Sequence, residues 1–159
     1  MAKYEIKLDH IADVVAYVAL PEAIGASSWG IRLFFAVVGE NGYVKGENLN
    51  AKILPRGEDA ALIRADNCFE LNVRIVLQTD DNALIYASYG GIIDMTEEEA
   101  NSFLTGSLPP NLNLFTTPRF ETAHENYQWL TRIQAVGRGS VEPEGDLFKV
   151  SYSWYALNA

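Results

Sequence analysis

Carboxylates, guanidinium groups and phenols are the side chains that could do chemistry in this sequence. Arg74 stands in an alternating segment whose polar positions also hold Glu70, Asn72 and Gln78. A guanidinium beside an amide and a carboxylate can anchor a carboxylate, phenolate or enolate. The alternation alone favours a second interpretation, in which this polar face is a solvated outer surface. Arg74 is therefore a candidate anion anchor if the face lines a barrel lumen.

Three carboxylates are candidate acids or bases: Asp59, Asp81 and Glu121. A buried carboxylate next to an arginine would be an ionised general base. Asp59 and Asp81 also have a simpler interpretation, in which each fixes a loop by accepting hydrogen bonds from backbone amides. For Asp80, which precedes Asp81, the turn interpretation is the better one.

The segment 120–130 supplies Tyr127 and Trp129 beside Glu121. A helix this short cannot bury itself, so its aromatic side chains must pack inward, either as a core plug or as the wall of a ligand pocket. Tyr127 is also a candidate proton donor. The residues expected to line the pocket are aromatic: Trp129, Tyr89, Phe35 and Phe115. Such walls suit a small aromatic or otherwise apolar ligand.

The composition argues against several other chemistries. The 159 residues hold 12 Lys and Arg against 21 Asp and Glu, a formal net charge of -9, which argues against nucleic acid as a partner. Two histidines and one cysteine cannot form a histidine-rich or thiolate-rich metal site, and neither histidine has a visible partner for a nucleophilic triad. Carboxylate sites stay open as a type of metal site, but we assign none. We expect no metal and no cofactor.

Alternating strands must position these candidates. Residues 68–79 place apolar side chains on one face and polar ones on the other, and a turn at Thr79–Asn82 leads into a second strand over 83–94. That second strand and residues 29–38 are apolar on both faces. Either a helix or another subunit would have to cover them.

Further strands are expected over 4–8, 11–20, 46–54, 62–65, 131–137 and 147–155, with hairpin turns at 39–42 and 55–58 and a glycine-rich turn over 137–145. Thr96 and Thr122 each begin a capping box, which predicts two short helices. The sequence thus predicts a mainly all-β fold, an antiparallel barrel of about nine or ten strands with two short helices, in a single domain spanning residues 1–159.

Several motifs occur in an order that resembles the domain of unknown function 3237 family. The motifs are Gly46-x-x-Leu49, Ile53-Leu54-Pro55-x-Gly57-x-Asp59, Glu70-Leu71-Asn72-Val73-Arg74, Thr79-Asp80-Asp81-x-Ala83-x-Ile85, Tyr89-x-Gly91, Phe120-Glu121-Thr122 and Tyr127-x-Trp129-Leu130. The resemblance covers about residues 30–155 and implies a small, often self-associating β-barrel. Because Arg74 recurs in it, it also implies that Arg74 faces the lumen.

Two positions depart from the pattern of this family. Asn82 stands where glycine is expected after the paired aspartates, and Phe115 stands where tyrosine is common. A phenol is therefore missing at position 115.

The expected location follows from what the sequence lacks. The first residues do not form the continuous apolar stretch of a secretory signal, and the apolar runs fall short of the ~20 residues that a membrane helix needs. We expect a cytoplasmic protein with no membrane contact. The strands that are apolar on both faces and the family resemblance lead us to expect a homo-oligomer.

Two functions of different classes fit the sequence. The first is a cofactor-independent lyase, isomerase or hydratase, in which Arg74 anchors an anion, Asp81, Asp59 or Glu121 moves protons, and the substrate is an aromatic or carbonyl-bearing small molecule. The second is a carrier or sensor that binds an apolar molecule and leaves it unchanged. A third interpretation is an oligomeric scaffold whose interior is filled by its own aromatic side chains.

Overall fold

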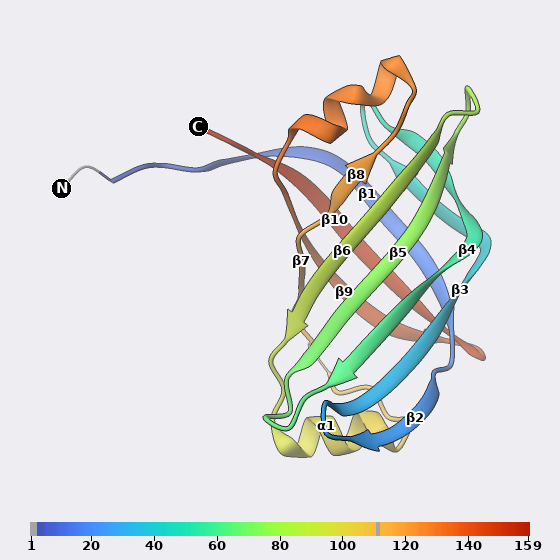
Figure 1. The fold of residues 1–159 in the computed structure, drawn as a ribbon, viewed down its shortest axis with the longest axis vertical. Helices are drawn as coiled ribbons and strands as arrows, with labels where there is room; N and C mark the ends of the chain where they lie inside the picture. The colour runs from blue at the N-terminus through green and yellow to red at the C-terminus, as the bar shows by residue number, and fades with distance from the viewer. Residues whose placement is uncertain (1–2, 111) are drawn as a thin grey trace.

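Strands dominate this computed structural model, which describes residues 3–110 and 112–159 (Figure 1). The strands are β1 (Lys7–Ala19), β2 (Glu22–Ser27), β3 (Gly30–Lys45), β4 (Asn50–Ile63), β5 (Phe69–Thr79), β6 (Leu84–Ile93), β7 (Leu114–Thr116), β8 (Arg119–Glu121), β9 (Ala135–Glu144) and β10 (Leu147–Asn158). An α-helix, α1 (Glu97–Leu104), and a 3-10 helix, η1 (Glu125–Arg132), lie at opposite ends of the strands.

Eight of the strands in the described part of the chain close into an antiparallel barrel. The order around it is β1, β10, β9, β7, β6, β5, β4 and β3, and β3 pairs back to β1. The short β2 pairs with β3, and β8 pairs with β6. Closure leaves few unpaired edges, which is how antiparallel sheets of this size avoid edge-to-edge association. The predicted mainly-β barrel with two short helices is confirmed.

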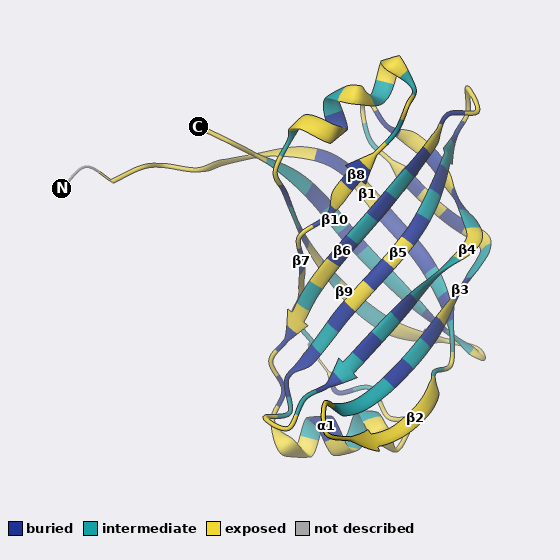
Figure 2. Cartoon of the chain, viewed as in Figure 1, coloured by how far each residue is buried: buried dark blue, intermediate teal, exposed yellow. Residues whose placement is uncertain are grey.

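Alternation along each strand decides which side chains face the interior (Figure 2). In β5 the predicted apolar face, from Phe69 to Leu77, is buried inside the barrel. Arg74 has the opposite parity and is exposed on the outer face, with its Nη1 3.8 Å from Oε1 of Glu58. The prediction that Arg74 faces the lumen is therefore wrong, because it would require the buried Val73 and Ile75 to face outward.

The two hairpin turns expected at 39–42 and 55–58 are irregularities inside two long strands. The pairing of β3 with β4 jumps from Ala36↔Glu58 to Tyr43↔Lys52. Gly39 lies directly against Pro55, since a Cβ on Gly39 would come within 2.3 Å of the Pro55 nitrogen. Proline has no N–H to donate to the neighbouring strand, so the hydrogen bonds between β3 and β4 are interrupted at Pro55. Both strands continue beyond it.

The other predicted boundaries also differ from the structure in places. The strands expected over 4–8 and 11–20 form one strand, β1, which begins at Lys7. The glycine-rich segment 137–145 belongs mostly to β9, and the reversal comes at Gly145, whose φ is +61°. Gly139 is needed within β9, because a Cβ there would come within 2.5 Å of the Tyr152 ring.

The first predicted helix is confirmed and the second is shifted. Thr96 caps α1 as expected: its Oγ1 accepts from Glu99 N at 3.2 Å, and Glu99 Oε2 accepts from Thr96 N at 2.8 Å. The predicted capping box at Thr122 is wrong, because Thr122 Oγ1 accepts from His124 N at 3.2 Å, two residues along the chain, and donates to the Leu84 carbonyl at 2.8 Å. His124 caps η1 through a hydrogen bond that its Nδ1 accepts from Asn126 N.

Helix α1 closes one end of the barrel with an aromatic side chain. Phe103 lies 5.2 Å from Phe69 and 6.4 Å from Phe35, measured between ring centroids. Neither helix of the described chain lies over the outer face of β6, where Leu84 and Ile92 stay exposed. The apolar outer face that the sequence predicted to be covered is thus open in the single chain.

Candidate functional site

A cavity of about 60 Å³ lies inside the barrel, beneath Phe103. Its walls come from all eight barrel strands and from α1, and are mostly apolar: Ala16, Val18, Phe35, Val37, Asp59, Phe69, Leu71, Val73, Ile75, Tyr89, Ile93, Phe103, Leu114, Val141, Phe148, Val150 and Tyr152. We call this cavity the chamber. Its volume holds a few water molecules, so a ring-sized ligand requires aromatic side chains to move aside. Of the lining residues, Asp59, Tyr89 and Tyr152 carry polar side-chain atoms.

Asp59 reaches the chamber because β4 continues through the irregularity at Pro55. Its cross-strand neighbours are Phe35 on β3 and Val73 on β5, and Val73 in turn lies opposite Tyr89 on β6. Residues directly opposite one another share a face of the sheet, so all four point inward. Asp59 is the acidic member of this row and is only 9% exposed.

The environment of Asp59 changes its protonation. Burial raises the pKa of its carboxyl from 3.8 to about 6, which means that desolvation outweighs the opposing contributions. Those are a hydrogen bond of 2.8 Å from Asn72 N to Oδ1 and the positive charge of Arg32. Arg32 is the arginine near this carboxylate, and its Nη1 donates to the Ala60 carbonyl at 2.7 Å. Asp59 can thus exchange a proton near neutral pH.

Tyr89 and Tyr152 form a buried pair of phenols beside Asp59. Their ring centroids are 5.7 Å apart and the rings meet edge to face at 78°. Burial raises the pKa of both hydroxyls, and the negative charge of Asp59 raises them further. Both phenols therefore stay protonated and can donate hydrogen bonds to an oxygen that gains negative charge.

Tyr152 is the residue of this group that the sequence analysis missed. It lies on β10 between the inward-facing Val150 and Trp154. The alternation of β10 was the available signal, since Phe148, Val150, Tyr152 and Trp154 share one parity. What the sequence could not supply was the placement of β10 across the barrel from β6.

The structure divides the residues predicted from sequence into separate places. Asp59, Tyr89 and Phe35 meet in the chamber, whereas Arg74 and Glu121 are exposed on the outside of the barrel. Phe115 is 55% exposed and lies 6.0 Å from the Arg138 guanidinium. These last three residues do not line the chamber.

Asp81, Tyr127 and Trp129 lie at the other end of the barrel, away from α1. Asp81 Oδ1 accepts hydrogen bonds from the Tyr127 hydroxyl at 2.9 Å and from Thr79 Oγ1. The hydrogen bond from Thr79, followed by that from Tyr127, holds the pKa of the Asp81 carboxyl below its usual value. Tyr127 and Trp129 also line an open surface pocket. This cluster connects the β5–β6 turn to η1.

The β5–β6 turn explains why the departure from the family pattern at Asn82 is tolerated. Asn82 has a φ of +64°, in the left-handed region that glycine enters freely and that asparagine enters more readily than most residues. Its backbone N–H donates to the Thr79 carbonyl at 2.9 Å. An asparagine at this position therefore forms the same tight turn.

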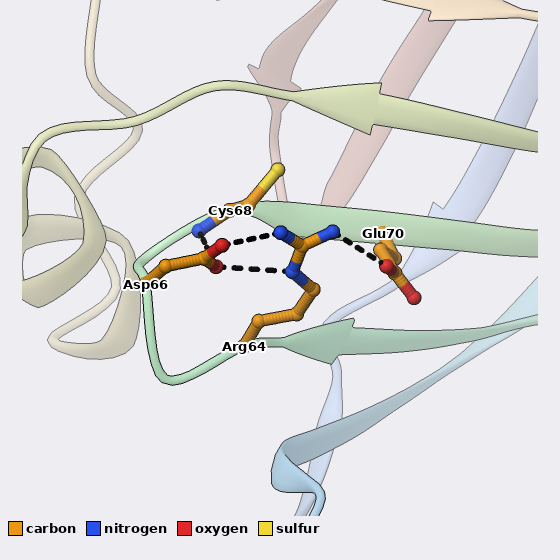
Figure 3. A network of polar contacts seen from close by, with 4 residues as sticks. All are labelled: Arg64, Asp66, Cys68 and Glu70. Carbon is orange, nitrogen blue, oxygen red and sulfur yellow. Dashed lines mark hydrogen bonds and ion pairs between the residues drawn. The ribbon is translucent and has the colours of Figure 1, made fainter.

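A third polar network closes the β4–β5 turn near α1 (Figure 3). Arg64 donates to Glu70 Oε1 at 2.9 Å and forms a two-pronged ion pair with Asp66. Cys68 N donates to Asp66 Oδ1 at 3.3 Å, and burial raises the pKa of the Cys68 thiol. The thiol is therefore a weak nucleophile, which agrees with a structural role.

Metal-binding and membrane-spanning features can be checked over residues 3–110 and 112–159. In these ranges no three His, Cys, Asp or Glu side chains are grouped so that they could hold a metal ion. The same ranges contain no helix that is both long and apolar enough to cross a membrane.

The fold and its interior define a class: a closed antiparallel barrel with a buried carboxyl and two phenols facing an apolar chamber. The chain belongs to the family described as "Protein of unknown function (DUF3237)", whose sequence profile matches residues 6–157. The resemblance seen in the sequence motifs is thereby confirmed.

Relatives and solved structures agree with this membership. A UPF0311 protein of Rhodopseudomonas palustris (strain TIE-1) is 33% identical over 134 residues, which are 83% of this chain and 86% of that protein. A crystal structure of a protein with unknown function from Clostridium acetobutylicum ATCC 824 is 28% identical, with a TM-score of 0.87 over 99% of this chain and 100% of that one. A structure described as an enzyme from Penicillium herquei is 16% identical, with a TM-score of 0.69 over 99% of this chain and 98% of that one, and shows the fold alone.

Proposed function

We propose that this protein is a cofactor-independent enzyme that performs acid–base chemistry on a small, largely apolar carbonyl or aromatic molecule inside the chamber. The observation that carries the proposal is Asp59, whose carboxyl is 9% exposed, has a pKa of about 6 and faces apolar walls. Buried carboxyls with a pKa near neutral pH, placed in a cavity, are typical of general acids and bases.

The chemistry divides between the carboxylate and the two phenols. Near pH 7 the Asp59 carboxylate accepts a proton from a carbon next to a carbonyl, or from a hydroxyl group. Tyr89 and Tyr152 donate hydrogen bonds to the substrate oxygen as it gains negative charge. Return of the proton to a different position gives an isomerisation, and loss or addition of water gives a lyase or hydratase reaction.

This division of roles differs from the one expected from sequence. Arg74 cannot anchor an anion in the chamber from the outer face, so the phenols take over stabilisation of the developing charge. Asp81 and Tyr127 already bond to each other at the far end, and Glu121 is exposed on β8. Asp59 is the predicted acid–base candidate that also lines the cavity.

Proton exchange at carbon tests the proposal without knowledge of the natural substrate. The probes are small ketones, namely cyclohexanone, 2-cyclohexenone and acetophenone, and their exchange into D₂O is followed by NMR. We expect the protein to accelerate exchange of at least one probe, with a rate that rises with pH through about 6 as Asp59 ionises. Asp59→Asn should lower the rate by roughly 100-fold or more, the usual share of a general base.

The matched control is Glu58→Gln, one residue away on the outer face, which removes the same charge outside the chamber. It should leave the exchange rate unchanged. A rate for the unmodified protein equal to that of buffer, with every probe shown to bind, would refute acid–base catalysis. Equal loss in the two variants would remove Asp59 from its proposed role.

A carrier or sensor is the second candidate, because all chamber walls apart from Asp59, Tyr89 and Tyr152 are apolar. Such a protein would bind the same molecules and release them unchanged. Binding without any exchange or conversion after long incubation, in both the unmodified protein and Asp59→Asn, would favour the carrier.

A further inference from the structure

Residues 3–9, which we call the arm, lead out of the barrel at the start of β1. Over residues 7–9 the arm pairs with β10 on one side only, with Lys7 opposite Asn158 and Leu8 opposite Leu157. Pairing of β1 with β3 begins at Asp13. Figure 1 shows the two ends of the chain leaving the barrel on the same side. Within the described residues, the second edge of the arm therefore offers unpaired backbone groups.

The arm has the alternation of a strand that has one apolar face. Tyr4, Ile6 and Leu8 share that face and are 94%, 68% and 54% exposed. The opposite face carries charges of alternating sign: Lys3, Glu5, Lys7 and Asp9. The apolar face continues onto Leu157, directly opposite Leu8. Figure 2 shows this exposed ribbon beside the otherwise alternating barrel. An open edge together with an exposed apolar face is an interaction surface.

We propose that two copies of this chain associate by pairing their arms as antiparallel strands, about a two-fold axis at Ile6. In this register each Ile6 lies opposite the same residue of the other copy, and Tyr4 lies opposite Leu8. On the charged face Glu5 lies opposite Lys7, and Lys3 lies opposite Asp9. All apolar residues of the arm share one face of the joined sheet, and every charge faces its opposite.

Among the registers that keep the two faces separate, the charges exclude every axis at a charged residue. An axis at Glu5 would place Lys3 opposite Lys7 and Glu5 opposite itself. An axis at Lys7 would place that lysine opposite itself and Glu5 opposite Asp9. Like charges directly opposite one another destabilise a strand pair, whereas opposite charges and apolar pairs stabilise it. Axes at Tyr4 and at Leu8 also oppose unlike charges, but each pairs fewer residues of the arm with one another than the axis at Ile6, which pairs all of residues 3–9. A second copy of the chain is thus the partner that the arm sequence fits.

The hydrogen bonds at the base of the arm are compatible with this pairing. Asp9 already accepts through Oδ2 from Asn158 Nδ2 at 2.8 Å, which leaves its other oxygen for Lys3 of the second copy. Beyond the arm, Gly46 lies against the Ile11 carbonyl, so the free edge ends there. The resulting sheet runs continuously from β10 and β1 of one copy to β1 and β10 of the other.

Charge reversal tests both the surface and the register. Sedimentation velocity over a range of micromolar concentrations should show a dimer for the unmodified protein. Glu5→Lys places a lysine opposite Lys7 twice per dimer, and Lys7→Glu places a glutamate opposite Glu5 twice. Each change should raise the dimer dissociation constant by roughly 10- to 100-fold. Both positions are exposed, so far-ultraviolet circular dichroism should be unchanged.

Mixing the two variants gives the decisive measurement. In a mixed dimer of Glu5→Lys with Lys7→Glu, both of these cross-strand charge pairs are attractive again, so the mixture should dimerise while each variant alone dissociates. The control is Glu40→Lys, an equal change in charge at an exposed position of β3, which should leave the dissociation constant unchanged. A monomeric unmodified protein, variants that dimerise normally, or a mixture that stays monomeric would each overturn the proposal.

Discussion

The buried carboxyl of Asp59 should make the stability of the fold depend on pH. In the unfolded chain this group has its ordinary pKa of 3.8, whereas burial raises the pKa to about 6 in the folded protein. Below pH 3.8 the carboxyl is protonated in both states, so folding buries no charge there. Between pH 3.8 and about 6 the unfolded chain ionises more readily than the folded protein, so the stability of the fold falls as the pH rises. Above about 6 the folded state holds a buried charge and the loss of stability is complete.

The size of the effect follows from the two pKa values. A change from 3.8 to about 6 corresponds to about 3 kcal/mol of folding free energy, since one pKa unit is worth about 1.4 kcal/mol. Asp59→Asn keeps the shape of the side chain and an oxygen that can accept from Asn72 N. It removes the charge. Relative to the unmodified protein, the variant should therefore gain about 3 kcal/mol of stability between pH 4 and pH 8.

Urea unfolding at five pH values between 4 and 8 measures this difference. The comparison cancels the titration of the other carboxyl groups, because they are common to both proteins. Glu58→Gln is the control, and its stability relative to the unmodified protein should vary little with pH. A difference between Asp59→Asn and the unmodified protein that stays constant from pH 4 to pH 8 would refute the argument that Asp59 is buried and charged near neutral pH.

Three further substitutions test the chamber, the far cluster and the helix cap. Phe103→Ala removes an aromatic wall of the chamber and should cost about 3 kcal/mol of stability, while a ring-sized ketone should bind more tightly in a calorimetric titration. Weaker binding would show that Phe103 does not restrict the chamber. Tyr127→Phe breaks the 2.9 Å bond to Asp81 and should leave ketone exchange within twofold of normal, whereas a large loss of exchange would place the far cluster in the reaction. Thr96→Ala removes the cap of α1 and should lower stability by about 1 kcal/mol in urea unfolding, and no change would show that the cap contributes nothing.

Local sequence patterns predicted those features whose causes are local. The alternation of β5 placed its apolar face correctly, because the side-chain period of a strand is set by the backbone. The capping box at Thr96 predicted the start of α1 for a similar reason, since donor and acceptor lie three residues apart. The Thr122 capping box had the same sequence signature and failed, because Thr122 bonds to the distant Leu84 carbonyl and accepts from His124 N, and η1 begins only at Glu125, after His124.

The candidate site was harder to predict, because its residues depend on contacts between distant strands. For Asp59 the sequence left two interpretations open, a general base or a residue that fixes a loop, because Pro55 and Gly57 are typical turn residues. In the structure Pro55 lies against Gly39 of the neighbouring strand, so β4 continues and Asp59 faces inward. Arg74 was misplaced for the opposite reason: the family resemblance outweighed the parity of its own strand, which indicated the solvent side.

The sequence by itself determined the barrel class, the inward faces of the long strands and the scarcity of histidine and thiol chemistry, because composition and side-chain period are properties of the chain. Only the tertiary structure decided which polar groups share the interior. Asp59, Tyr89 and Tyr152 come from strands β4, β6 and β10, and barrel closure brings them to one chamber. Closure also removes water from Asp59 and so raises the pKa of its carboxyl. This shift depends on the assembled barrel and could not be predicted from the residue type.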